Sequence, residues 1–139
     1  MTRSLLFLAI SSVIFLVSCT NQIPVKEENI MGIWHVTSFK ANTPEISAEL
    51  LAKGKEEALS LTYQYMSGHR VRMQSIYYLD GAMGKWTVNE NEQSITMESL
   101  FDGQKVSETY LITSLSPKTM QWHQRLEGIG ELEFTLTRL

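Results

Sequence analysis

The sequence predicts an all-β fold, an eight-stranded antiparallel up-and-down barrel with a short helical segment between strands 1 and 2. Apolar and polar residues alternate with a period of two from residue 59 to the end, which is typical of half-buried strands. Turn signals such as Ser67-Gly68, Asp80-Gly81 and Asp102-Gly103 recur at intervals close to those of all-β barrels and sandwiches. The links between successive strands are short, which favours a meander over a Greek key. Closing the meander removes its exposed edges.

The first strand is predicted over residues 30–39, and seven more follow. We expect them at residues 59–66, 71–79, 84–88, 95–97, 106–115, 120–126 and 132–138. The last strand runs antiparallel to the first, which brings Arg138 near Trp34. Arg138 has the same parity as Phe134 and Leu136, so we expect it to point inward at the end of the barrel.

The first strand contains Gly32-Ile33-Trp34, and a second Gly84-Lys85-Trp86 opens a middle strand. The first tripeptide resembles the Gly-x-Trp of lipocalins and their relatives, and the resemblance covers residues 30–139. It implies that Gly32, Trp34 and Arg138 close one end of a lipocalin-like barrel, with the tryptophan packed beneath the arginine. Overall the chain is similar to the small lipocalin-like lipoproteins of bacterial envelopes.

A helical segment is predicted over residues 44–59. Thr43 can cap it and Pro44 suits its first position. Gly54 costs about 1 kcal/mol inside a helix, so the segment is either one interrupted helix or two short ones. Fatty-acid-binding relatives of the lipocalins also insert helices after the first strand.

The N-terminus predicts a lipoprotein leader. Arg3 precedes the apolar run Leu5–Val17, which has the length of a signal-peptide core and is shorter than the roughly 20 residues that span a bilayer. The run ends in Leu16-Val17-Ser18-Cys19, which resembles the lipobox of bacterial lipoproteins. The resemblance implies a signal peptide over residues 1–18, cleavage before Cys19 and acylation of this cysteine and its new amino group, with palmitate among the expected acyl groups. An ordinary secretory leader with a chance cysteine is the alternative.

The expected location is the bacterial cell envelope, with the membrane as a partner through the lipid on Cys19. Thr20 stands where lipoproteins of the inner membrane commonly have aspartate, which favours the outer membrane. Lys26-Glu27-Glu28 is similar to a surface-export signal but begins later than that signal usually does, so the leaflet stays open. Residues 19–29 are predicted to be a lipidated flexible tether, and residues 30–139 the barrel domain.

Composition excludes some classes of function. The chain has 139 residues, which predicts one domain, and carries 12 basic against 15 acidic side chains. No basic cluster is visible, so nucleic acid is not an expected partner. Cys19 is the single cysteine, so no internal disulfide can form and the fold depends on its apolar core.

No catalytic or metal-binding motif appears in the sequence. His35, His69 and His123 lie far apart, and none has a second histidine or cysteine at ligand spacing. Nucleophile elbows, phosphate loops and zinc-protease motifs are also missing. We therefore expect a protein that is not an enzyme and that uses no cofactor or metal.

The inner face of the barrel leaves two functions open. Inward parity falls on Tyr63, Tyr65, Trp86, Tyr110 and Trp122. An eight-stranded barrel either fills itself with side chains or holds one small ligand. In the first hypothesis these five residues line a site for a small hydrophobic ligand, with the helical segment over its mouth. In the second, the core is filled and the protein is a non-enzymatic protein-binding or structural module with an envelope protein as partner.

Overall fold

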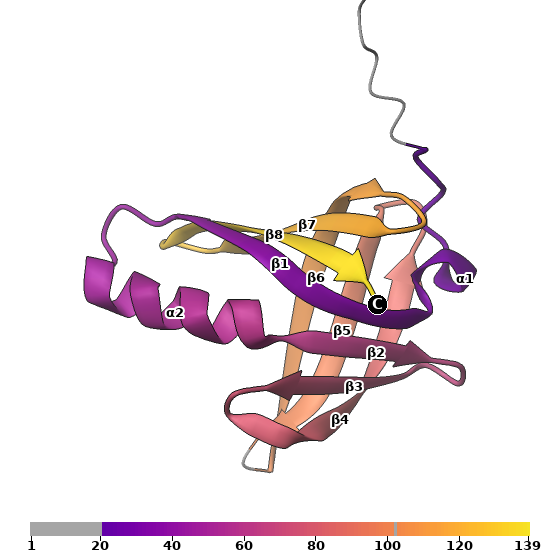
Figure 1. The fold of residues 1–139 in the computed structure, drawn as a ribbon, viewed down its shortest axis with the longest axis horizontal. Coiled ribbons are helices and arrows are strands. Elements are labelled where there is room, and N and C mark those ends of the chain that lie inside the picture. Colours follow the sequence, from indigo (N-terminus) through magenta and orange to yellow (C-terminus); the bar gives the residue numbers. More distant parts are fainter. Residues whose placement is uncertain (1–20, 102) are drawn as a thin grey trace, which may run out of the picture.

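A computed structural model of the chain describes residues 21–101 and 103–139, and it shows a closed antiparallel barrel of eight strands in sequence order (Figure 1). The strands are β1 (Gly32–Asn42), β2 (Thr62–Met66), β3 (Arg70–Ser75), β4 (Tyr78–Asn89), β5 (Ser94–Phe101), β6 (Gln104–Leu115), β7 (Thr119–Leu126) and β8 (Gly130–Arg138). The helices are α1 (Glu27–Ile30) and α2 (Ala48–Ser60). The predicted all-β barrel with a helix between the first two strands is confirmed. The predicted leader and Cys19 lie outside the described residues.

The first and last strands close the barrel. β1 pairs with β8 from Trp34 opposite Arg138 to Asn42 opposite Glu131. The register shifts between Val36 and Ser38, and this bulge adds one residue to β1. Side chains of a regular strand point alternately to its two faces, and an added residue reverses this alternation beyond the bulge. Val36 and Phe39 therefore both pack against the core, although they are three residues apart.

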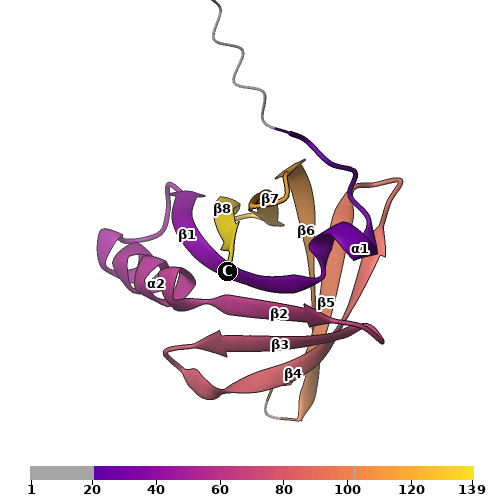
Figure 2. The same ribbon diagram turned by 45° about the vertical axis from the view of Figure 1, so that its right-hand side comes forward.

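We call the end of the barrel that holds Trp34 and Arg138 the closed end. The opposite end, reached by the β3–β4, β5–β6 and β7–β8 connections, is the open end. Helix α1 lies at the closed end, and α2 lies beside the barrel toward the other end (Figure 2). β2 pairs with β1 only over residues 32–35, and α2 packs along β1 beyond that point.

Helix α2 begins later than predicted. Thr43 and Pro44 form a turn, in which the Ile46 N–H donates to the Thr43 carbonyl at 3.1 Å. Thr43 lies at the end of β1, at the start of this turn, and its buried Oγ1 has no hydrogen-bond partner among the described residues, so it does not cap the helix. Ser47 is the cap, and its Oγ accepts from the Leu50 N–H at 3.3 Å. The helix then runs without interruption through Gly54, so neither the interrupted helix nor the two short helices predicted from this glycine is found.

The turn predicted at Asp80-Gly81 is wrong. β3 ends at Ser75 and β4 begins at Tyr78, so the chain reverses at Ile76-Tyr77. The Ser75 Oγ stabilises this reversal by accepting from the Tyr77 N–H at 3.2 Å. Gly81 has a φ of +82° within β4, where the register with β3 shifts. Its left-handed backbone therefore serves a bulge and not a hairpin turn.

The described part of the predicted tether lies against the barrel. The Ile23 N–H donates to the Leu115 carbonyl at 2.8 Å, and Ile23 and Val25 pack on the core. Ile30, at the end of α1, is fully buried. These apolar side chains cover the closed end, so residues 22–30 are part of the folded body, and the prediction of a flexible tether does not hold for residues 22–29.

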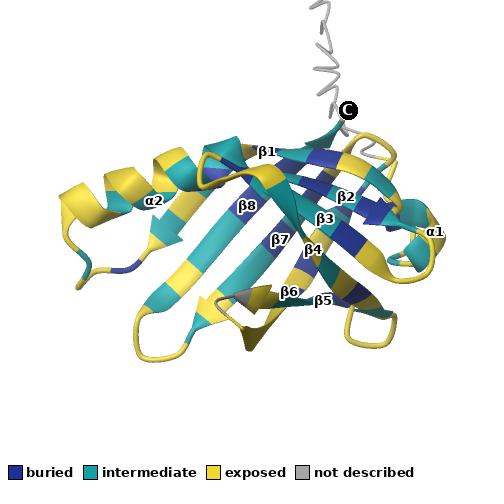
Figure 3. Ribbon diagram, turned by 90° about the horizontal axis from the view of Figure 1, so that it is seen from below, coloured by how far each residue is buried: buried dark blue, intermediate teal, exposed yellow. Residues whose placement is uncertain are grey.

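Buried and exposed positions alternate along the strands (Figure 3). We call the half of the barrel next to the closed end the closed half, and the other the open half. The largest fully buried side chains include three tryptophans and lie mainly in the closed half. Toward the open end, inward positions such as Met73, Gln124 and Leu132 are only half-buried. The core is therefore densest next to the closed end.

Candidate functional site

The closed end is held by one arginine and one tryptophan. The Arg138 Cζ lies 4.2 Å from the centroid of the Trp34 ring, a cation–π contact. Its guanidinium also donates to the carbonyls of Asn29 at 2.7 Å, Pro117 at 2.8 Å, and Met31. Arg138 therefore joins the N-terminal segment, the β6–β7 turn and the indole in one contact network.

Gly32 makes room for this arginine. Its φ is +127°, and a Cβ placed on it would lie 2.5 Å from the Arg138 Nη1. The Trp34 Nε1 donates to the Ile30 carbonyl at 2.7 Å, which ties the indole to the end of α1. The glycine, the tryptophan and the arginine predicted to close the barrel thus meet at one place.

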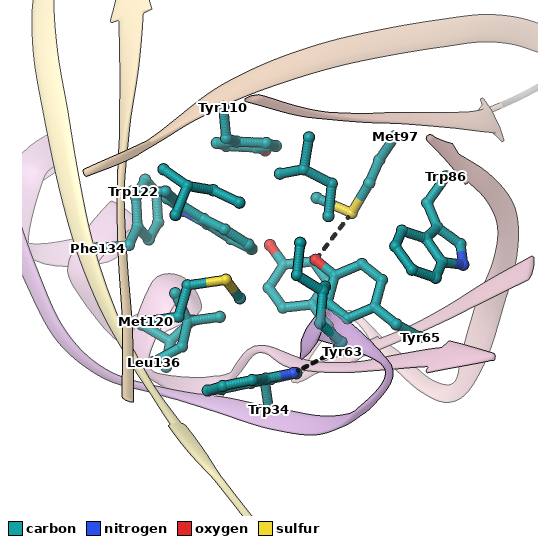
Figure 4. Close-up of a cluster of buried hydrophobic side chains, with 14 of the residues drawn as sticks. Trp34, Tyr63, Tyr65, Trp86, Met97, Tyr110, Met120, Trp122, Phe134 and Leu136 are labelled. Carbon is teal, nitrogen blue, oxygen red and sulfur yellow. Dashed lines mark hydrogen bonds between the residues drawn. The ribbon is translucent and has the colours of Figure 1, made fainter. Parts of the chain in front are cut away.

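The five aromatic residues predicted to line a ligand site form one continuous set of ring contacts inside the barrel (Figure 4). Tyr110 stacks on Trp122 at 4.7 Å between ring centroids, and Tyr63 meets the edge of Trp122 at 5.3 Å. Tyr63 stacks on Tyr65 at 6.0 Å, and Tyr65 contacts Trp86 at 5.1 Å. All five side chains are buried, so these rings fill the space that they enclose.

The polar atoms of these rings have different partners. The Trp86 Nε1 donates to the Met66 carbonyl at 3.0 Å, and the Tyr65 hydroxyl donates to the Met97 sulfur at 3.4 Å. The Tyr110 hydroxyl donates to the Glu108 Oε2. The Trp122 Nε1 is buried and has no hydrogen-bond partner among the residues that the structure describes.

The three buried tyrosines keep their protons at ordinary pH. Burial raises the pKa of Tyr65 and of Tyr110 well above the usual value. Burial also raises the pKa of Tyr63, and the negative charges of Glu108 and Glu57 add to this effect. Each hydroxyl is therefore a hydrogen-bond donor.

Glu108 was not predicted as a site residue. It has the same parity as Tyr110, two residues further on, and its hydrogen bond with that tyrosine places the carboxylate on the inner side of β6. Glu108 and Val106 are nevertheless exposed, so solvent reaches the inner face of β6 at the open end. The shared parity of Glu108 and Tyr110 is the signal that the sequence offered.

The aromatic site divides into two parts. Tyr63, Tyr110 and Trp122 lie together with Phe134, whose ring centroid is 6.1 Å from that of Trp122. We call these four rings the aromatic floor, because Glu108 lies on its open side. The Tyr65–Trp86 pair lies apart from the floor and is joined to it through Tyr63.

The histidines do not meet. His35 contacts the Thr62 hydroxyl at 3.0 Å, His69 contacts Glu27 at 3.1 Å, and His123 lies 3.8 Å from Glu133. Within residues 21–101 and 103–139, no group of three or more histidine, cysteine, aspartate or glutamate side chains could hold a metal ion. No helix in the same part of the chain is long and apolar enough to cross a membrane.

Comparison with protein-family models gave no match, and comparison with curated proteins gave none either. Function is therefore inferred from the barrel itself.

Proposed function

We propose that this chain is a lipid-anchored, lipocalin-like protein of the bacterial envelope that binds a small hydrophobic ligand in the open half of its barrel. The observation that carries the proposal is the Glu108 carboxylate, hydrogen-bonded by Tyr110 on the inner wall and open to solvent beside the aromatic floor. Ligand sites in proteins typically combine an apolar lining with a few convergent polar groups.

The aromatic floor suits the apolar part of such a ligand. Its rings are buried and packed against one another, so they form a rigid base beneath the open half that does not have to be ordered on binding. Phe39 extends this surface toward the open end, with its ring centroid 5.2 Å from that of Phe134. The apolar area that a ligand could still cover lies above the floor, on the half-buried Phe39, Met73 and Leu132.

The polar groups favour a ligand that carries a hydrogen-bond donor. Glu108 uses Oε2 for Tyr110, and its Oε1 forms no hydrogen bond with the described residues. The buried Trp122 Nε1 also lacks a partner there, and such a donor costs about 1–3 kcal/mol while it is unpaired. The packed rings enclose the Trp122 Nε1, so the polar group that a ligand can reach is Glu108, and a ligand that donates a hydrogen bond to its Oε1 would satisfy the carboxylate.

The direction of the N-terminus supports an anchored arrangement. Residues 22 and 23 meet the barrel at the closed end, where Gln22 hydrogen-bonds Ser114 at 2.9 Å. A lipid on Cys19, which we propose holds the protein at the outer membrane, would therefore attach near the closed end and leave the open end free.

The alternative function is a non-enzymatic protein-binding or structural module of the envelope. It is favoured by the way side chains fill the half of the barrel next to the closed end. Tyr65 and Trp86 are buried there, Tyr63 stacks on Tyr65, and Tyr110 stacks on Trp122. In that case an envelope protein would bind the loops or the outer face of the sheet. The two functions differ in whether the open half takes up a small molecule.

The deciding experiment is native mass spectrometry, with solvent extraction, of the full chain purified from its own envelope. We expect a co-purifying apolar molecule that Glu108→Gln or Tyr110→Phe releases and that Glu131→Gln, an exposed carboxylate on β8, retains. A clean unliganded mass, together with unchanged tryptophan emission on adding apolar probes, would refute ligand binding and support the alternative.

A further inference from the structure

The outer surface of β3 to β6 carries a groove of about 410 Å³, within the usual size range of ligand sites. It lies where two strands part, because the β4–β5 pairing stops at Gly84 opposite Ser99, whereas β4 continues beside β3 to Tyr78. The lining includes Arg70, Met83, Lys85, Glu98, Leu100 and Lys105. The lining residues of β4, Met83 and Lys85, have the parity opposite to that of the buried Trp86, so they face away from the barrel interior.

The groove is positively charged on an acidic protein. Three cations, Arg70, Lys85 and Lys105, and one carboxylate, Glu98, give it a formal charge of +2, whereas the whole chain carries −3. Glu98 stands opposite Lys85 in the strand register, but its carboxylate forms an ion pair with Lys105 at 3.2 Å.

Two of the cations oppose each other directly. Arg70 on β3 pairs in register with Lys85 on β4, and like charges in this position destabilise a sheet. Within the described part of the chain, neither side chain forms a hydrogen bond or an ion pair. An anion between them would relieve the repulsion and supply the missing partner.

The lining also contains two large apolar side chains that are unusually exposed. Met83 is 53% exposed and Leu100 is 73% exposed, although both are large hydrophobic residues. The groove thus combines two unpaired cations with an apolar strip on the same outer face. A molecule that is anionic at one end and hydrocarbon at the other fits both features.

We propose that this groove binds a single-chain anionic amphiphile, a carboxylate or phosphate monoester with an alkyl tail. The head group lies between Arg70 and Lys85, and the tail covers Met83 and Leu100. This site lies on the outer face of the barrel, whereas the aromatic floor lies inside it and mainly on other strands, so the groove does not depend on the ligand proposed for the barrel interior.

Methionine methyl resonances can distinguish the two sites in one titration. In the full chain labelled with ¹³C-methyl methionine, Met83 reports the groove, whereas the buried Met97 and Met120 report the interior. On adding octanoate we expect a saturable shift of the Met83 signal with Met97 and Met120 unchanged. Octanol and octylammonium, which have the same tail without the negative charge, should bind at least tenfold more weakly.

Charge variants test the head-group contacts. Arg70→Gln and Lys85→Gln replace exposed side chains, so the fold is retained, and each should weaken octanoate binding about tenfold. Arg125→Gln, an exposed cation on β7, should leave it unchanged. Equal binding of octanol, unchanged binding in both groove variants, or shifts at Met97 and Met120 instead of Met83 would overturn the proposal. A Met83 response to phosphatidylglycerol vesicles but not to octanoate would also overturn it, in favour of a membrane contact.

Discussion

Replacing Trp34 by alanine tests whether the closed end holds the barrel together. The indole is fully buried, its Nε1 donates to the Ile30 carbonyl at 2.7 Å, and Arg138 lies over its face at 4.2 Å. The substitution removes one ring that contacts the N-terminal segment, the apolar core of the barrel and the arginine of the last strand. All three parts should therefore loosen together.

The expected loss is about 3–5 kcal/mol, the usual cost of truncating a buried tryptophan to alanine. The contact with Arg138 accounts for about 0.5–2 kcal/mol of it, and the remainder comes from lost apolar burial and from the cavity left behind. A domain of this size is typically stable by about 5–15 kcal/mol. The variant should therefore lose a large fraction of its free energy of unfolding.

Urea unfolding followed by far-ultraviolet circular dichroism measures the effect. We expect a lower midpoint for Trp34→Ala with a similar slope, since the barrel still unfolds as one unit. Leu79→Ala is the matched control, because Leu79 is 78% exposed and its removal should change stability by no more than about 0.5 kcal/mol. A Trp34→Ala midpoint equal to that of the unmodified chain would refute the role given to the closed end.

Three further predictions concern local features. Gly32→Ala should destabilise the barrel by about 1–3 kcal/mol, because a φ of +127° strains alanine and the new Cβ would crowd the Arg138 guanidinium; a thermal melt measures this, and an unchanged melting temperature would contradict it. The stability contributed by the buried tyrosines should be fully present below pH about 10, the pKa of unfolded tyrosine. Above that pH it should fall by about 1.4 kcal/mol per pH unit for each of Tyr63, Tyr65 and Tyr110, because burial raises the pKa of all three in the folded protein. Urea midpoints at about pH 9 and 11 test this sign, Tyr63→Phe should reduce the loss, and a rise at the higher pH would exclude it. Ser47→Ala should cost about 0.5–2 kcal/mol through loss of the α2 cap, and equal urea midpoints for the variant and the unmodified chain would show that Ser47 does not cap the helix.

The barrel could be predicted because the sequence features that specify it are local and recur in every strand. Each strand alternates in polarity, each connection is short, and the strands pair in the order in which they occur. The meeting of Trp34 and Arg138 follows from antiparallel closure, since the start of β1 must lie beside the end of β8. Parity also placed the five aromatic side chains in the interior, where the structure finds them.

The errors in the predicted turn and in the predicted helix cap arose where one sequence pattern is compatible with two local structures. Asp80-Gly81 is typical of a hairpin turn, but a glycine with positive φ is equally suited to a bulge, and the apolar Ile76-Tyr77 gives no sign of the actual reversal. Thr43 and Ser47 are both acceptable caps in sequence. The turn at Pro44-Glu45 separates Thr43 from the helix, so Ser47 is the cap, and no local pattern reports this turn.

The candidate site could be predicted only in part. Aromatic residues of inward parity are evident from the sequence, but a charged residue such as Glu108 is normally assigned to the surface. Its exposure is real, yet its hydrogen bond to Tyr110 places the carboxylate on the inner wall. A barrel with one solvent-accessible end allows a residue to be both inward and exposed, and sequence parity does not reveal which end is accessible.

The division of the barrel into two halves suggests that stability and binding can be changed separately. The closed half contains Trp34, Arg138 and the covering residues 22–30, and its contacts fix the strands. Glu108 lies in the other half and accepts a hydrogen bond from the Tyr110 hydroxyl, and the ring of Tyr110 is already held by stacking on Trp122. Loss of the Glu108 charge should therefore alter ligand binding with little effect on unfolding. Loss of Trp34 should lower the free energy of unfolding but leave ligand binding unchanged under conditions in which the barrel stays folded, because the aromatic floor is built by other strands.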